Sequence, residues 1–268
     1  MTTENTTHNN DNNDNNDHSP ENDNNNNNNS PMTDNHPSSE AILMHADNES
    51  MTRQKLTPQQ IADMYHHTKI LAPMVRVNQL PFRYMVATDF GADVVYSEEL
   101  IDKKLVRTHR VINPELQCVE YVDSSDLERL NKARRQVEVE KTKFHAHVSN
   151  SSGNNKEYAP SKKLSKLLQR PKPVFQTSPI LETKPLVLQI GTSSADLAVQ
   201  TAQHMYHDFD VIDVNCGCPK HFSISGGMGA ALLKDRERLC SILKSLVQSI
   251  DKPVTCKIRL LDNMSDTI

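Results

Sequence analysis

Two cysteines, an amide and a proline stand together in the run VNCGCPKHFSISGGMGAALL, residues 214–233. The preceding residues are apolar enough for a buried strand, so Asn215, Cys216 and Cys218 are expected where that strand ends. The C-x-C spacing differs from the C-x₂-C of zinc sites and of thioredoxin-type redox pairs. The three other cysteines form no second clip, so we expect no metal site.

Cys218 differs from the other cysteines in its place along the chain. It lies past the strand end and directly before Pro219, which restricts the backbone and removes a hydrogen-bond donor. A turn should therefore present this thiol, and a thiol at such a place can face a pocket and exchange a proton. Cys240 and Cys256 are expected to be small buried hydrophobic residues.

The run Gly226-Gly-Met-Gly229 does not match the G-x-G-x-x-G fingerprint of dinucleotide-binding loops, which lies directly between strand and helix. Its glycines suggest instead a loop that closes over a flat ligand.

Apolar runs alternate with helical patterns from Thr68 onward, which predicts a parallel α/β sheet covered by helices. A doubly wound sheet and a (β/α)₈ barrel both fit this alternation. The expected strands are Lys69–Met74, Asp93–Glu99, Pro185–Gly191, Asp210–Asn215 and Pro253–Arg259, with a possible further strand at Gln117–Val122; the expected helices are Pro81–Phe90, Ser193–His207 and Leu232–Ile250.

Polar or reactive residues recur at the carboxyl end of every expected strand, where both architectures place function. Gln189 offers a donor and an acceptor to a planar heterocycle, and Lys257 supplies a cation inside an apolar run. These ends together predict a site for a conjugated cofactor. They read Pro-Met-Val-Arg (73–76), Glu-Glu (98–99), Gln-Ile-Gly (189–191), Asn-Cys-Gly-Cys-Pro (215–219) and Lys-Ile-Arg (257–259).

Composition separates an N-terminal segment from the rest of the chain. Residues 1–30 contain 14 asparagines, and residues 1–50 carry ten acidic side chains and no Lys or Arg. Such a segment has little apolar surface to bury, so residues 1–60 are expected to form a disordered leader. The whole chain has a net charge of −4, so residues 51–268 carry +6.

Targeting and redox signals indicate the compartment. The start MTTENTTHNN lacks the features of a signal peptide, and no apolar run approaches the ~18 residues of a membrane span. The odd cysteine count favours a reducing compartment. We expect a cytoplasmic or nuclear protein without a membrane partner.

A basic insertion interrupts the alternation at about residues 124–172. From Glu128 to Lys172 it carries twelve Lys or Arg against four Glu, and the run SSGNNKEYAPSKK within it is typical of a loop or of disorder. An arm that binds a nucleic-acid backbone and a merely solvated insertion are equally compatible with this composition.

The strand ends, in their order, closely resemble those of the tRNA-dihydrouridine synthases, most of all the eukaryotic tRNA-dihydrouridine(20) synthase subfamily. The resemblance covers residues 68–123 and 174–262 and leaves out the insertion and the leader. The motifs that carry it are APMVRVNQLPFR (72–83), DVVYSEELID (93–102), VLQIGTS (187–193), IDVNCGCPKHFSISGGMGAALL (212–233) and PVTCKIRL (253–260).

This resemblance implies a (β/α)₈ TIM barrel, with residues 65–268 supplying about its first five βα units. It implies FMN at the mouth of the barrel, NADPH as the reductant, and tRNA as the substrate, in which a D-loop uracil, at position 20, is reduced at its 5,6 double bond. A monomer is expected. By this resemblance Cys218 is the general acid; Met74, Val75, Arg76, Glu99, Gln189 and Lys257 contact the FMN; and Asn215 orients the uracil or the flavin.

The same comparison leads us to expect that the family's remaining strands, its FMN phosphate site and its helical tRNA-binding domain lie beyond Ile268. Two alternatives stay open. One is another FMN-dependent barrel oxidoreductase that acts on a small molecule, and the other is a non-catalytic RNA-binding protein that uses the basic insertion.

Overall fold

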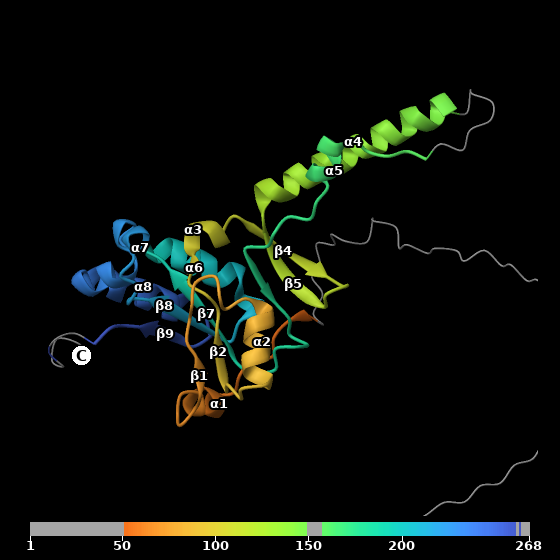
Figure 1. The fold of residues 1–268 in the computed structure, drawn as a ribbon. Helices are drawn as coiled ribbons and strands as arrows, with labels where there is room; N and C mark the ends of the chain where they lie inside the picture. Colours follow the sequence, from red (N-terminus) through yellow and green to blue (C-terminus); the bar gives the residue numbers. More distant parts are fainter. Residues whose placement is uncertain (1–50, 149–156, 261–262, 264–268) are drawn as a thin grey trace, which may run out of the picture. The chain divides into compact units, whose positions relative to one another are not determined.

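The computed structural model describes residues 51–148, 157–260 and 263 (Figure 1). Residues 1–50 of the expected leader lie outside this range. Residues 51–60, which we assigned to the leader, are folded. Arg53 donates from Nε to Oδ2 of Asp210 at 2.8 Å, and Thr57 and Gln60 form a capping box at the start of α1 (Pro58–Asp63). The folded part therefore begins earlier than the composition suggested.

The main sheet has six parallel strands, and the five on its continuous path follow one another in chain order. All five expected strands are present, each somewhat shorter than predicted. A doubly wound sheet reverses its strand order at a switch point, whereas a barrel keeps chain order, so the observed order favours the barrel alternative. The strands are β1 (Ile70–Leu71), β2 (Val94–Tyr96), β7 (Leu186–Gly191), β8 (Val211–Asn215) and β9 (Val254–Lys257), and β3 (Leu100–Ile101) pairs with the end of β7.

The two faces of this sheet differ, because successive side chains on a strand point to opposite sides. On one face, Leu188 and Ile190 of β7 and Ile212 and Val214 of β8 belong to the largest apolar cluster of the described residues. The same cluster includes buried side chains of two helices that lie side by side in Figure 1, α6 (Ala195–His204) and α8 (Arg236–Ser249). This face of the sheet therefore packs against α6 and α8 and is the outer face.

The other face of the sheet changes from apolar to polar along each strand. Val187 and Val211 lie in a small apolar cluster with Tyr96, near the strands' amino ends. Two residues further along, β7 carries Gln189 and β8 carries Asp213, both buried. The carboxyl ends of the inner face are therefore lined with polar side chains.

The helices depart from the expected ranges in two places. The expected helix Ser193–His207 is shorter, because α6 ends at His204 and a 3₁₀ segment, η3 (Tyr206–Asp208), follows it. The expected helix Leu232–Ile250 is divided into a 3₁₀ segment, η4 (Gly229–Lys234), and α8. The division falls at Asp235, whose side chain accepts a hydrogen bond from the backbone N–H of Arg238 and so caps α8. The remaining helices near the sheet are α2 (Leu80–Thr88), α3 (Asp102–Leu105) and α7 (His221–Ser225).

A second, antiparallel sheet stands between β3 and β7 in the chain, in the order β4-β5-β6. β5 confirms the possible strand at 117–122, while β4 and β6 were not predicted. Asp208 of η3 ties this sheet to the rest, because its carboxylate accepts hydrogen bonds from Arg110 of β4 and Tyr121 of β5. The strands are β4 (Thr108–Asn113), β5 (Cys118–Asp123) and β6 (Phe175–Thr177).

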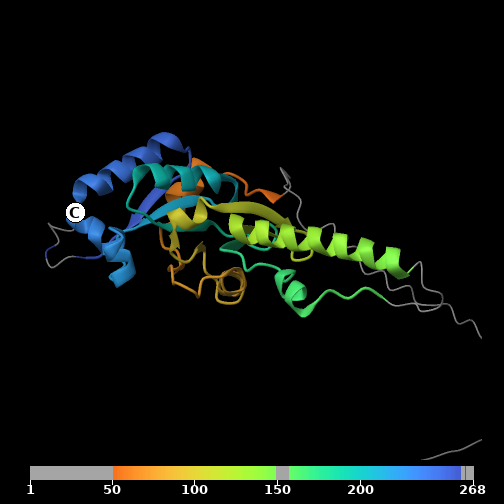
Figure 2. The same cartoon turned by 90° about the horizontal axis from the view of Figure 1, so that it is seen from above.

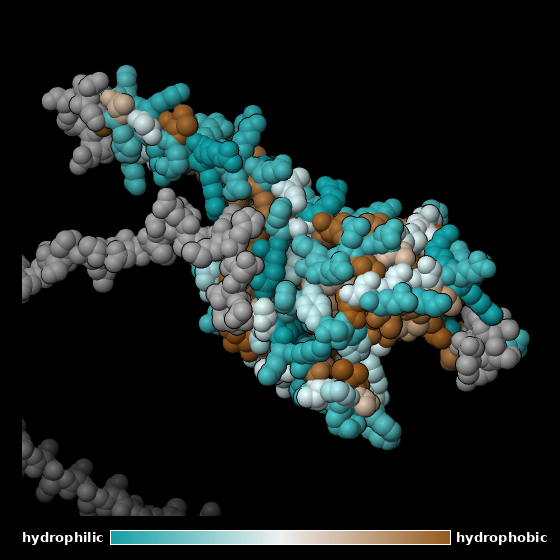
Figure 3. Space-filling model, turned by 180° about the vertical axis from the view of Figure 1, so that it is seen from behind, coloured by the Kyte–Doolittle hydropathy of each residue, from teal (hydrophilic) through white to brown (hydrophobic). Residues whose placement is uncertain are grey.

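The basic insertion is largely helical, which its polar composition had not indicated. It contains α4 (Ser124–Val148) and α5 (Lys162–Leu167), which lie alongside each other in Figures 1 and 2. Ala133, Val137 and Leu164 are buried between them. Part of the run SSGNNKEYAPSKK, residues 151–156, lies outside the described residues. In Figure 3 the insertion is mostly hydrophilic, whereas apolar surface appears over the part formed by the main sheet.

Among the described residues, no helix is both long and apolar enough to cross a membrane. No group of three or more His, Cys, Asp or Glu side chains in the described ranges is arranged to hold a metal ion.

Candidate active site

A pocket of about 460 Å³ lies at the carboxyl ends of the parallel strands. Its lining comes from segments that are far apart in the chain, as expected for a site built on successive strand ends. The lining residues are Pro73, Val75, Glu99, Gln189, Asn215, Gly217, Cys218, Pro219, Lys220, Lys257 and Arg259.

Six of the eight predicted site residues line this pocket, namely Val75, Glu99, Gln189, Asn215, Cys218 and Lys257. Met74 and Arg76 do not. Both are exposed, and Arg76 has a positive φ of 65° with its backbone N–H bound to the Glu98 carboxylate at 2.6 Å. The loop after β1 therefore presents Val75, rather than its two neighbours, to the pocket.

Asn215 shapes the turn that presents Cys218. Its side-chain oxygen accepts hydrogen bonds from the backbone N–H groups of Gly217 at 2.9 Å and Cys218 at 3.1 Å. This is an Asx turn, in which the side chain replaces the strand ladder that ends here. The backbone carbonyl of Cys218 accepts from Ala230 at 3.0 Å. The thiol is thus held by a turn, as Pro219 suggested, and the oxygen of Asn215 is already engaged in holding it.

Gly229 packs directly beneath Cys218. A Cβ at this position would stand 2.6 Å from the Cys218 carbonyl oxygen, 3.1 Å from the Cys218 Cβ and 2.5 Å from Ser223 Oγ. Its φ is +59°, in the left-handed region that favours glycine. Gly229 therefore lets the glycine run pack directly against the turn that holds Cys218. The sequence analysis had not assigned this role to the run.

We expect Gly229→Ala to displace the Cys218 turn, because the backbone carbonyl that it would meet cannot rotate away. Unfolding by urea should show a loss of stability of roughly 1–3 kcal/mol. Gly91→Ala is the matched control: its φ is +67°, but an added Cβ would meet only Lys69 Nζ, at 3.9 Å. If both variants lose the same stability, the close approach to Cys218 contributes nothing beyond backbone strain.

Glu99 brings a buried carboxyl group into the pocket. It is 8% exposed, and its Oε1 has no hydrogen-bond partner in the part of the chain that the structure describes. Burial raises the pKa of this carboxyl, and the neighbouring Cys218, Asn215 and Ser223 lower it by less. A Cβ at Gly191 would lie 2.8 Å from Oε1. Position 191 of β7 therefore has to be a glycine to leave room for the Glu99 carboxyl. The group is positioned to accept a hydrogen bond from a ligand.

The raised pKa of Glu99 predicts how its stability contribution depends on pH. Because the folded chain holds this proton more tightly than the unfolded chain, Glu99 stabilises the fold at low pH, and that contribution is lost as pH rises through the folded pKa. Glu99→Gln should therefore stabilise the fold at pH 7, with a gain that shrinks towards pH 4. Urea unfolding at both pH values measures this gain, with the exposed Glu237→Gln as the control. A gain that instead grows towards pH 4 would contradict the assignment.

Gln189 is oriented by the polar inner face of the sheet. Its Nε2 donates to Oδ2 of Asp213 at 2.7 Å, and Asp213 also accepts from the Thr255 hydroxyl at 2.7 Å. These residues are register partners on β7, β8 and β9. Burial raises the pKa of the Asp213 carboxyl. Asp213 thus fixes the amide of Gln189 so that its oxygen remains available towards the pocket.

The pocket carries two cations that the sequence analysis did not single out as site residues. Lys220 and Arg259 line it beside Lys257. Arg259 also donates from Nε to the Gly217 carbonyl at 2.5 Å, which joins the end of β9 to the cysteine turn. The signal was present for Arg259, since it ends the quoted Lys-Ile-Arg run, but only the fold brings it to Gly217.

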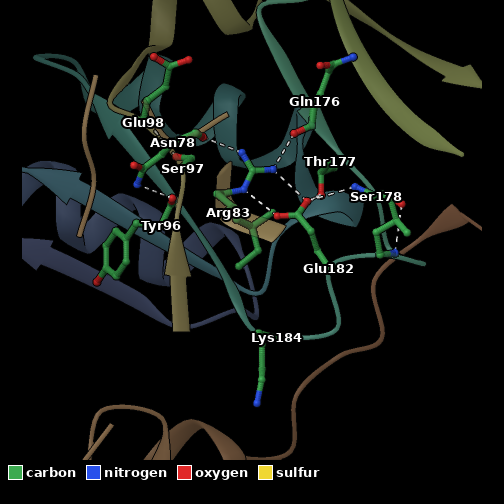
Figure 4. A network of polar contacts seen from close by, with 12 residues as sticks. Asn78, Arg83, Tyr96, Ser97, Glu98, Gln176, Thr177, Ser178, Glu182 and Lys184 are labelled. Atoms are coloured by element: carbon green, nitrogen blue, oxygen red, sulfur yellow. Dashed lines mark hydrogen bonds and ion pairs between the residues drawn. The ribbon is translucent and has the colours of Figure 1, made fainter. Parts of the chain in front are cut away.

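A buried ion pair between Arg83 and Glu182 is linked by hydrogen bonds to the carboxyl ends of β1 and β2 (Figure 4). Arg83 of α2 donates to both carboxylate oxygens of Glu182, at 2.7 and 2.9 Å, and to the backbone carbonyl of Asn78 at 2.8 Å. Asn78 in turn donates to the carbonyls of Ala72 and Tyr96, at 2.8 and 2.9 Å. The sequence analysis gave Arg83 no role of its own, although it ends the quoted run APMVRVNQLPFR.

The other cysteines separate by burial. Cys216 and Cys118 are fully buried, Cys256 is partly buried, and Cys240 is exposed on α8. The expectation of a buried hydrophobic role is thus wrong for Cys240, whose helix position faces solvent. Cys216, beside the candidate acid in sequence, points into the apolar core, so Cys218 is the cysteine of this pair that lines the pocket.

The parallel strands follow one another in chain order, and a thiol, a buried carboxyl and cations gather at their carboxyl ends. This is an α/β fold whose parallel sheet is consistent with part of a barrel, with the candidate site at the strand ends. A family model described as Dihydrouridine synthase (Dus) matches residues 158–267. The chain belongs to the dihydrouridine synthase family, which confirms the resemblance seen in its motifs.

Individual relatives extend this result over most of the chain. The tRNA-dihydrouridine(20) synthase (NAD(P)+) of Saccharomyces cerevisiae is 41% identical over 204 residues, which is 74% of this chain and 42% of the relative. The protein of the same name from Schizosaccharomyces pombe is 36% identical over 76% of this chain and 34% of the relative. tRNA-dihydrouridine synthase B of Xanthomonas axonopodis pv. citri is 38% identical over 79 residues, 29% of this chain and 24% of the relative. The chain thus spans less than half the length of these relatives.

Proposed function

We propose that the protein is a tRNA-dihydrouridine synthase that reduces the 5,6 double bond of a uracil in the D-loop of tRNA, at position 20. The observation that carries this proposal is the convergence of six predicted site residues, from separate stretches of the chain, on one pocket. The names of the two yeast relatives support the substrate and a nicotinamide reductant. The sequential order of five parallel strands along the sheet supports a (β/α)₈ barrel, of which they are a part.

The residues of the pocket fit FMN. The unpartnered Oε1 of Glu99 suits a ring N–H donor, the amide oxygen of Gln189 suits a second, and Lys257 adds positive charge for an electron-rich ring. When bound there, FMN would supply hydride chemistry for C6 of the uracil, with NADPH as its reductant. Val75 would pack against the ring, and Met74 and Arg76, which lie outside the pocket, would contact the cofactor only at its rim.

Cys218 serves as the general acid in this proposal. Its thiol lines the pocket on a turn fixed by Asn215 and Gly229, so the sulfur can approach C5 and donate its proton there. Asn215 orients the base or the cofactor with its amide nitrogen, since its oxygen holds the turn. The uracil must leave its stack to enter the pocket, which costs least in a loop.

The test is formation of dihydrouridine. The protein, supplied with FMN and NADPH, is incubated with an unmodified tRNA transcript, and the digested nucleosides are identified by mass spectrometry. Dihydrouridine at position 20 supports the proposal. Reduction of free uracil or of an enoate, with tRNA left unchanged, would show a small-molecule oxidoreductase, and tRNA binding without any reduction would show a non-catalytic RNA-binding protein.

We further propose a monomer that acts in the cytoplasm or the nucleus. The free state of all five cysteines supports a reducing compartment. Gel filtration and imaging of a tagged protein test these two points.

A further inference from the structure

The helical insertion contains a second cavity, remote in sequence from the site motifs. It has a volume of about 590 Å³ and lies between the first turns of α4 and the segment that includes α5. Five of its lining side chains are cationic and one is a carboxylate. They are Arg129, Lys163, Lys166, Arg170, Lys172 and Asp126. We call this cavity the basic cleft.

Hydrogen bonds and an ion pair hold residues that line the basic cleft in place. Arg129 donates to the Leu167 carbonyl at 3.2 Å, and Arg170 pairs with the buried Glu120 of β5 at 2.6 Å. Beneath the charged surface, Leu164 and Val137 are buried between the helices. The insertion thus has its own small apolar core, and this core holds the helix segments that carry the cations in a defined arrangement.

Three of the cations are left without partners. Lys163, Lys166 and Lys172 are exposed, and no hydrogen bond or ion pair joins their ammonium groups to other described residues. Gathering like charges costs free energy through repulsion, which a bound polyanion relieves. Lys163 and Lys166 lie three residues apart on α5, so they share one side of that helix, and Lys172 lies in the segment that follows it.

We propose that the basic cleft binds the phosphate backbone of RNA and supplies a docking surface separate from the strand-end pocket. Several Lys and Arg side chains that line one cleft suit a polymer of phosphates better than a single anion. A membrane surface suits it less, because the apolar side chains Ala133, Val137 and Leu164 are turned inward, whereas a membrane-binding helix exposes such a face. This inference rests on the proposed function for the identity of the RNA, a tRNA.

Binding is tested on the full chain with a fluorescently labelled, unmodified tRNA transcript, by anisotropy over a series of salt concentrations. The variant Lys163→Ala/Lys166→Ala/Lys172→Ala should weaken binding by about ten-fold or more near 100 mM salt. Its slope of log K against log salt should fall by about two to three. Lysine-to-arginine replacement at the same positions should restore both, because the role needs charge and not packing.

The matched control removes three lysines elsewhere, Lys69→Ala/Lys184→Ala/Lys244→Ala. Lys69 and Lys184 precede β1 and β7, and Lys244 lies on α8. This variant has the same net charge as the cleft variant, so its affinity should stay within about two-fold of the parent if the position of the charge matters. Circular dichroism shows whether either triple variant has lost helix.

The outcomes separate this inference from the proposed function. If the cleft variant binds tRNA with the affinity and salt slope of the parent, or if the parent binds no tRNA, the inference is overturned. Competition by poly-glutamate as effective as that by RNA would also overturn it, in favour of an acidic protein partner. If the parent makes no dihydrouridine but loses RNA affinity in the cleft variant alone, the proposed function fails and the cleft assignment stands.

Discussion

If the protein is the proposed tRNA-dihydrouridine synthase, replacing Cys218 by Ala should reduce dihydrouridine formation by about 10²–10⁴-fold, the usual contribution of a positioned general acid. The side chain lines the strand-end pocket, and its turn is held by backbone hydrogen bonds to Asn215 and Ala230 that the substitution keeps. Cys218→Ala also retains the Cβ that faces Gly229. The variant should therefore fold normally and lose only the proton donor.

Two measurements separate loss of the acid from loss of the site. Visible absorbance reports bound flavin, which should be equal in Cys218→Ala and the parent, and mass spectrometry of digested tRNA reports dihydrouridine. Cys240→Ala is the matched control, because Cys240 is an exposed cysteine on α8, away from the pocket lining. A Cys218→Ala protein that retains activity within ten-fold of the parent would assign the acid to another group.

Replacing Arg83 by Met should destabilise the fold by about 3–5 kcal/mol, because it leaves the Glu182 carboxylate buried without its cation. The two side chains are 1% and 2% exposed. The Glu182 carboxylate would keep only the hydrogen bonds from the Thr177 hydroxyl and the Ser178 N–H, at 2.8 and 3.2 Å. Domains of this size are usually stable by only about 5–15 kcal/mol, so the loss removes much of the total. Urea unfolding measures it.

Arg238→Met is the control for this second prediction. Arg238 forms an ion pair with Asp235 at 3.1 Å, but the two side chains are 47% and 40% exposed, so its loss should cost less than about 1 kcal/mol. Removing both charges, in Arg83→Met/Glu182→Met, should cost less than the sum of the single variants, since no unpaired charge remains. Additive losses would show that the pair is not coupled.

The Arg83 pair also links stability to the pocket. Through Asn78 it holds the carbonyls of Ala72 and Tyr96, which lie at the ends of β1 and β2. Val75, in the loop after β1, lines the pocket three residues before Asn78. A weakened pair should thus loosen one wall of the pocket before the whole fold is lost. If the pocket holds FMN as proposed, bound flavin should fall in Arg83→Met even where the protein remains folded.

The sequence by itself determined the parallel α/β class, the five strands and the set of strand ends that carry the site. These follow from local signals, because apolar runs, helical periodicity and turn residues are written in short stretches of chain. Six of eight predicted site residues reached the pocket for the same reason: parallel strands place their carboxyl ends at one edge. Met74 and Arg76 lie outside the pocket lining, because a strand end fixes where the loop begins and leaves open which residue turns inward.

Only the tertiary structure decided the chain order of the strands, the support of Cys218 by Gly229, and the partners of Arg83 and Glu182, 99 residues apart. It also decided that the basic insertion is helical and encloses a cleft. Each of these features depends on contacts between segments that are far apart in the sequence. The residues around a side chain in the sequence do not indicate which distant residue it will contact. Charge composition shows that the insertion is basic. The burial of Val137 and Leu164 in one cluster, which packs α4 against α5, is seen only in the structure.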